Sequence, residues 1–136
     1  MKTVRAYLFF TALLFFLPSC HTPRVQDRKV MAGAERLGIT PEQYLCYKKY
    51  LVYRDRFTTF LNLPAQSTSE DIRSRVAGRL ELPKDSTWET LLTNKMVAPY
   101  LTDERRMKFS AMFGLSTNTS WVEVKDYLES LREKGK

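Results

Sequence analysis

Apolar residues are distributed along this chain in two different ways. Residues 6–17 form one nearly unbroken apolar run, interrupted only by Thr11 and by the hydroxyl of Tyr7. After about residue 26 the apolar residues recur at helical spacing, and glycine is scarce. No later stretch shows the period-two alternation between turn residues that is typical of strands. The pattern therefore predicts an apolar leader, a short polar connection and an all-α domain.

The helical part is predicted to be one small domain, residues 27–136, of about five to six helices. The expected helices span residues 26–37, 41–62, 69–80, 88–98, 103–113 and 121–133. Thr40 and Thr102 precede two of them as predicted N-caps. In the helix 69–80, Ile72, Val76 and Leu80 form one apolar stripe. Such a stripe needs a partner surface, so the helices are expected to enclose a core.

A stretch of twelve residues occurs three times and marks the boundaries between helices. The copies are LNLPAQSTSEDI from Leu61, LELPKDSTWETL from Leu80 and FGLSTNTSWVEV from Phe113, and they align without a gap. Each copy has an apolar residue, a spacer, a leucine and a polar loop, followed by a hydroxyl residue. Hydroxyl side chains accept the free N–H groups at helix starts, so Thr68, Thr87 and Ser120 are predicted N-caps.

This repeated stretch resembles a Leu-x-Leu-Pro…Thr-Trp-Glu helix linker of helical bacterial proteins, most of which have no known function. The first copy also resembles the opening of a J-domain. A J-domain needs a His-Pro-Asp loop, whereas the only histidine of this chain is His21, which lies before the domain. A co-chaperone function is therefore not expected.

The N-terminal run has the features of a secretory signal. Lys2 and Arg5 precede a 12-residue apolar core, and small residues follow it. The core is shorter than the ~20 residues that a spanning helix needs. Leu17-Pro18-Ser19-Cys20 resembles the lipobox of bacterial lipoproteins, although Pro18 departs from the usual residue there.

The lipobox resemblance implies that residues 1–19 are removed, that Cys20 is lipidated, and that the new N-terminus is acylated, with palmitate as the expected acid. Residues 20–26 are then the lipidated cysteine and a tether. The implied location is the membrane of the cell envelope, facing the periplasm or the exterior. By resemblance to the sorting of diderm lipoproteins, His21 after Cys20 favours the outer membrane. An ordinary cleaved signal and an uncleaved anchor are the alternatives.

The charge of the chain fits a membrane surface better than nucleic acid. The whole chain carries +7, and removal of residues 1–19 takes away Lys2 and Arg5 and leaves +5. The basic residues are spread over many helical segments, which indicates a solvated surface. Each basic residue near an anionic bilayer contributes about 1 kcal/mol to binding. Nucleic acid is not an expected partner, because the chain is exported and carries no recognition motif.

The chain offers few residues for catalysis or metal binding. A single histidine, placed in the tether, excludes a Ser-His-Asp or Cys-His arrangement in the domain. No His/Cys cluster with metal-ligand spacing occurs. No catalytic, cofactor-binding or metal-binding residue is therefore predicted. Cys46 cannot pair with a lipidated Cys20 and is expected to be a buried small hydrophobe.

The helix 41–62 is unusual because aromatic and basic residues alternate along it. Its rings recur at three- and four-residue spacing: Tyr44, Tyr47, Tyr50, Tyr53, Phe57 and Phe60. Most of these rings are expected to be core. Two lines of rings exceed the width of one buried stripe, so our hypothesis is that Tyr50, Tyr53 and Arg54 stay partly exposed and bind a partner. Trp88 and Trp121 occupy the same position after a cap, which favours a shared structural role.

These observations predict a lipid-anchored, non-enzymatic cell-envelope protein that binds another envelope component, either a protein or the cell wall. The first alternative is a freely secreted helical protein of the inhibitor or immunity type. A small carboxylate-dependent hydrolase is the second alternative. It is less favoured because the acid pairs Glu70-Asp71 and Asp103-Glu104 lie at expected helix starts.

Overall fold

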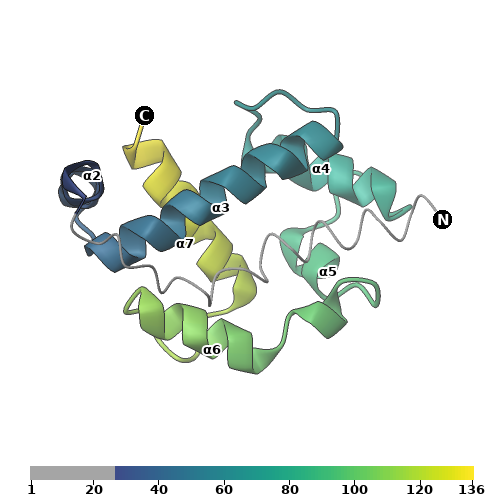
Figure 1. Cartoon of the computed structure of the whole chain (residues 1–136). Helices are drawn as coiled ribbons and strands as arrows, with labels where there is room; N and C mark the ends of the chain where they lie inside the picture. The colour runs from purple at the N-terminus through teal and green to yellow at the C-terminus, as the bar shows by residue number, and fades with distance from the viewer. Residues whose placement is uncertain (1–26) are drawn as a thin grey trace.

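The structure is a computed structural model that describes residues 27–136, and in this range it contains helices and loops but no strand (Figure 1). The α-helices are α2 (Arg28–Leu37), α3 (Pro41–Phe60), α4 (Ser69–Arg79), α5 (Trp88–Leu92), α6 (Asp103–Met112) and α7 (Trp121–Lys134). A 3₁₀ helix, η2 (Ala98–Tyr100), lies between α5 and α6. The predicted all-α class is confirmed.

The predictions for residues 1–26, namely the signal peptide, the lipidation of Cys20 and the tether, lie outside the described residues. Within residues 27–136, every helix is too short or too polar to cross a membrane.

The predicted helix starts are confirmed by their capping hydrogen bonds. The side chains of Thr40, Thr68, Thr87, Thr102 and Ser120 each accept a hydrogen bond from the backbone N–H three residues later. At three of these starts, α3, α4 and α7, the side chain of the third residue also accepts a bond from the cap's own N–H and completes a capping box. These contacts are local, which is why the sequence alone indicates them.

One predicted helix is too long. The interval 88–98 was expected to be a single helix, but α5 ends at Leu92. The side chain of Asn94 accepts a hydrogen bond from Met96 N–H, which gives the backbone an alternative to the helix. Pro99 lacks an N–H and disfavours the α conformation at Ala98. The chain therefore turns at Asn94 and continues as η2.

The three repeated stretches end their helices with the same backbone geometry. The spacer of each copy is in the left-handed conformation, with φ of 55° at Asn62, 59° at Glu81 and 65° at Gly114. The leucine after the spacer then donates its N–H to the carbonyl five residues earlier, at 2.8–2.9 Å: Leu63 to Thr58, Leu82 to Ala77 and Leu115 to Ser110. This is the Schellman pattern of helix termination. The C-terminus of α2 has it too, at Gly38 with φ 69°.

The helices enclose two hydrophobic clusters that share α3. One cluster joins the N-terminal half of α3 to α2, α6 and α7: Leu37, Cys46, Tyr47, Tyr50, Phe109, Phe113, Val124, Leu128 and Leu131. The other joins the C-terminal end of α3 to α4, α5 and the turn after α5: Phe57, Leu61, Ile72, Val76, Ala77, Leu91, Leu92 and Val97. Trp121 packs against both clusters, so the start of α7 lies where they meet. Cys46 is fully buried, as predicted.

Two glycines allow a test of the repeated helix ends. Gly114 has a left-handed φ, whereas Gly78 lies within α4, and a Cβ at either position would meet no atom within 4 Å. Gly114→Ala should lower the free energy of unfolding by about 1–2 kcal/mol, because an L-residue is strained there. Gly78→Ala should raise it by up to about 1 kcal/mol through helix propensity. Urea denaturation measures both, and changes of the same sign would contradict the assignment.

Candidate functional site

The structure does not expose the face of α3 that the aromatic pattern suggested. Tyr50 retains 3% of its exposure and Arg54 retains 1%, so the prediction that they are exposed is wrong for both. Tyr53 is half-buried, and the guanidinium of Arg56 lies over its ring at 5.8 Å from the centroid. The three residues therefore do not form one surface.

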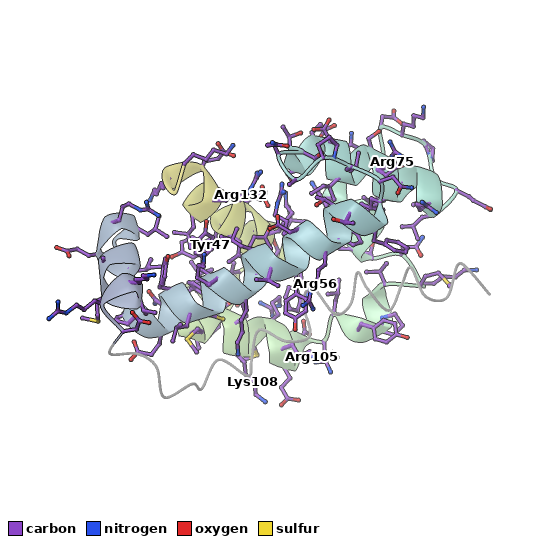
Figure 2. All side chains as sticks on the ribbon, turned by 45° about the horizontal axis from the view of Figure 1, so that its top comes forward. Tyr47, Arg56, Arg75, Arg105, Lys108 and Arg132 are labelled. Carbon is purple, nitrogen blue, oxygen red and sulfur yellow. The ribbon has the colours of Figure 1, made fainter. Side chains whose placement is uncertain are left out.

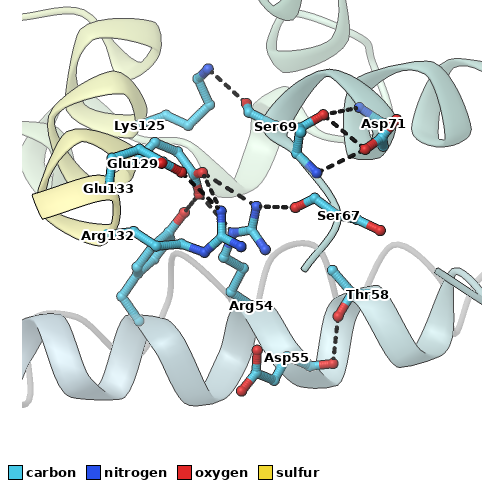
Figure 3. Close-up of polar contacts among 12 residues, drawn as sticks. Arg54, Asp55, Thr58, Ser67, Ser69, Asp71, Lys125, Glu129, Arg132 and Glu133 are labelled. Atoms are coloured by element: carbon cyan, nitrogen blue, oxygen red, sulfur yellow. Dashed lines mark hydrogen bonds and ion pairs between the residues drawn. The ribbon is translucent and has the colours of Figure 1, made fainter. Parts of the chain in front are cut away.

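Tyr50 and Arg54 are buried because both reach Glu129 on α7. Arg54 Nε donates to Glu129 Oε1 at 2.7 Å, and Arg54 Nη2 donates to Oε2 at 3.2 Å. Tyr50 donates its hydroxyl hydrogen to the same Oε1. Arg54 Nη2 also donates to the backbone carbonyl of Ser67 at 2.7 Å (Figure 3). Tyr50, Arg54 and Glu129, here called the buried cluster, thus connect α3, α7 and the loop before α4.

The electrostatics of the buried cluster keep its ion pair intact at neutral pH. Burial raises the pKa of Tyr50 well above its ordinary value, and the charge and hydrogen bond of Glu129 act in the same direction. Burial alone would raise the pKa of Glu129, but the hydrogen bonds from Arg54 and Tyr50 and the charges of Arg54 and Arg132 outweigh it. The pKa of Glu129 therefore lies below its ordinary value. The cluster holds a neutral phenol, a carboxylate and a guanidinium.

Arg54 belongs to a repeated feature that the sequence analysis missed. An arginine lies seven residues before each twelve-residue stretch, at Arg54, Arg73 and Arg106. Each donates to the backbone carbonyl 13 residues later, at Ser67, Ser86 and Thr119 respectively. That carbonyl always belongs to the residue just before the N-cap. Extending the alignment upstream by seven residues would have revealed the pattern.

The first arginine differs from the other two in its acidic partner. Arg73 and Arg106 pair with acids three residues earlier on their own helices, Glu70 and Asp103. The residue three before Arg54 is Leu51, and Arg54 pairs instead with Glu129, 75 residues further along the chain. One copy of the motif therefore carries a long-range contact, while the other two are local.

The two later copies position the two tryptophans of the domain. Trp88 is the first residue of α5 and Trp121 is the first residue of α7, each directly after its cap. Both are half-buried. Trp121 Nε1 donates to the carbonyl of Leu101 at 3.3 Å, and Lys125 Nζ lies 4.6 Å from the centroid of the Trp88 ring. The predicted structural role is thus present, but it leaves part of each indole open.

The open parts of the indoles line a groove between α5 and the start of α7. The groove has a volume of about 820 Å³, and its wall also includes Arg73, Asp85 and Glu89. A separate inner cavity of about 40 Å³ lies against the buried cluster and has room only for ordered water. Trp88, Leu92 and Trp121 line both spaces. The tryptophans therefore separate the groove from the interior.

A second hollow, of about 510 Å³, is smaller than the groove and has no aromatic residue in its wall. The basic side chains Arg56, Arg75 and Lys108 come from α3, α4 and α6. In Figure 2, Arg75 lies near the top, Lys108 near the bottom and Arg56 between them. Within residues 27–136 there is no group of three His, Cys, Asp or Glu side chains that could hold a metal ion. The groove is therefore the strongest candidate for a binding site in the described part of the chain.

Removal of Arg54 should cost far more stability than removal of its counterpart Arg106. Arg54→Ala leaves Glu129 in a largely buried position without its main cation, and the loss of one partner of such a pair costs about 3–5 kcal/mol. Arg106→Ala removes hydrogen bonds to the carbonyls of Thr117 and Thr119 near the surface and should cost about 1–2 kcal/mol. Urea denaturation at neutral pH compares them. Equal losses would show that the buried cluster is energetically unimportant.

The lowered pKa of Glu129 makes part of the stability dependent on pH. In the folded protein the pKa of Glu129 lies below its ordinary value of 4.5. The resulting stabilisation of the folded state is complete above that pH and is lost as the pH falls below it. Glu129→Gln should therefore lower the free energy of unfolding at neutral pH. It should also flatten the decline of that free energy between about pH 5 and pH 3. Glu104→Gln, which alters a carboxyl paired with Lys108 on the surface, should leave the decline nearly unchanged. An unaltered decline in Glu129→Gln would contradict this assignment.

Comparison with protein-family models, with curated proteins and with solved structures finds no match for this chain. Its function is therefore inferred from the geometry of the groove and from the N-terminal sequence.

Proposed function

We propose that this chain is a lipid-anchored, non-enzymatic protein of the bacterial cell envelope that binds another envelope component in the groove between α5 and α7. The observation that carries the binding function is the pair of half-buried tryptophans at equivalent positions in that groove. A volume of about 820 Å³ lies within the ~300–1,000 Å³ typical of ligand sites. The anchor is supported by the resemblance of Leu17-Pro18-Ser19-Cys20 to a lipobox.

Hydrogen bonds hold the backbone at the two helix starts that form walls of the groove. Arg73 holds the carbonyl of Ser86, two residues before Trp88, and Arg106 holds the carbonyl of Thr119, two residues before Trp121. The caps Thr87 and Ser120 lie between each anchored carbonyl and its indole. A backbone held in this way beside each indole loses little freedom on binding, which favours affinity.

The predicted tether between the anchor and the domain is short. Asp27, where the described part begins, is seven positions after Cys20. A fully extended chain of that length spans at most about 25 Å. A lipidated Cys20 would therefore hold the domain close to the bilayer, on the periplasmic or outer side. The residue after Cys20 is His21, which by resemblance favours the outer membrane.

The anchor is tested with Cys20→Ser. The wild-type protein should partition into the detergent phase, and its intact mass should correspond to a chain that begins at Cys20 and carries acyl groups. Several acyl chains anchor a protein stably, whereas one does so only marginally. Cys20→Ser should appear in the aqueous phase or remain unprocessed. A mature N-terminus elsewhere, without lipid, would contradict the anchor and support the freely secreted alternative.

Binding in the groove is tested by photocrosslinking in the cells that produce the lipid-anchored protein. A photoreactive amino acid at Glu89, an exposed residue of the groove wall, should yield a defined adduct. The same amino acid at Glu35, exposed on α2, provides the matched control and should yield none. Equal labelling from both positions, or no adduct from Glu89, would contradict a binding function for the groove.

A further inference from the structure

We infer that the groove binds a neutral glycan, because two half-buried indoles lie beside two carboxylates that accept no hydrogen bond from the described residues. The inference rests on the proposed function in that it assigns a ligand class to the same groove.

The carboxylates of the groove disfavour an anionic ligand and supply acceptors for hydroxyl groups. Asp85 and Glu89 are exposed. Neither carboxylate accepts a hydrogen bond from any residue of the range 27–136, and Asp85 interacts with the guanidinium of Arg73 only through its charge. An ionised carboxylate only accepts hydrogen bonds. A ligand that donates hydroxyl hydrogens can use both groups, whereas a phosphate or carboxylate ligand would be repelled by both.

A cation already lies against the Trp88 ring. Lys125 Nζ lies 4.6 Å from the Trp88 ring centroid, and Lys125 lines the inner cavity but not the groove. One face of that indole is therefore already paired with a cation. Lys125 and Arg73 are themselves paired with Asp126 and Glu70, so they do not exclude a cation from the groove. Tetralysine in the test below decides between a cationic and a neutral ligand.

An apolar peptide or helix also fits poorly, although much of the groove wall is apolar. Leu92, Leu101 and Val122 contribute to the wall beside the two indoles. An apolar partner covering this wall would also cover Asp85 and Glu89 without offering them donors. Burying polar groups without partners costs several kcal/mol of binding free energy in unfavourable cases, and more for charged groups.

A neutral sugar ring satisfies each of these surfaces at once. The C–H groups on one side of a pyranose form a flat apolar face that packs against an indole, while the hydroxyls around its edge reach neighbouring acceptors. Trp88 and Trp121 come from different helices, so each can carry a different ring of the same oligosaccharide. The Trp88 N–H has no acceptor among the described residues, which leaves a donor for a sugar oxygen. The predicted ligand is therefore an uncharged oligosaccharide, not a single sugar.

The test uses the full-length protein, purified with its anchor in detergent micelles, and four probes of equal length. These are cellotetraose, maltotetraose, tetra-N-acetylchitotetraose and the cationic peptide tetralysine. Tryptophan fluorescence and titration calorimetry should show saturable binding of at least one neutral tetrasaccharide and none of tetralysine. The double variant Asp85→Ala/Glu89→Ala should weaken that binding by at least about tenfold, or ~1.4 kcal/mol. The matched control Glu35→Ala/Asp55→Ala removes two exposed acids far from the groove lining and should bind as the wild type does.

Three results would overturn the glycan inference. They are saturable binding of tetralysine in place of the sugars, no saturable binding of any of the three tetrasaccharides, and sugar binding that is unchanged in Asp85→Ala/Glu89→Ala. The proposed function fails in a different way. A protein adduct from Glu89 together with no sugar binding would leave the groove a binding site and refute only its ligand class. Sugar binding by a chain without lipid on Cys20 would refute the anchor and leave the ligand class intact.

Discussion

The guanidinium of Arg54 connects three parts of the chain that are far apart in sequence. It lies on α3, pairs with Glu129 on α7 and holds the carbonyl of Ser67 before α4. An ion pair this deeply buried gains little net stability, because the loss of hydration offsets much of the attraction. Its main effect is on specificity: α7 satisfies both Arg54 and Tyr50 in only one register along α3. The hydrophobic residues around it, such as Leu128 and Val124, would tolerate a shift more easily.

The same arginine motif serves two purposes in one small domain. In its first copy the motif fixes long-range packing through Glu129, whereas in the later copies Arg73 and Arg106 use acids on their own helices. The later copies also carry the tryptophans, while the first has Ser69 in that position. Lys125 links the copies, because its ammonium donates to Ser69 Oγ at 3.2 Å and lies against the ring of Trp88. The repetition thus yields a structural anchor at one linker and a groove between the other two.

The sequence was sufficient for features that depend on neighbouring residues and insufficient for those that depend on distant ones. The repeated pattern predicted the helix starts and helix ends because both depend on hydrogen bonds within a few residues. The starts are capped by Thr68, Thr87 and Ser120, and the ends lie at Leu61, Leu80 and Phe113. The end of α5 at Leu92 was missed because the Asn94 side-chain turn leaves little trace in the apolar periodicity. The burial of Tyr50 and Arg54 depends on Glu129, more than 70 residues away, and no local signal indicates that pair.

One stripe of α7 relates the buried cluster to the groove. Trp121, Lys125 and Glu129 follow one another at intervals of four residues and therefore lie on the same face of the helix. The first lines the groove, the second is the cation behind Trp88, and the third is the acid that Arg54 binds. A shift of α7 by one turn would move all three together, by about 5.4 Å. The contact between Arg54 and Glu129 therefore sets the position of the groove wall, although neither residue touches the groove.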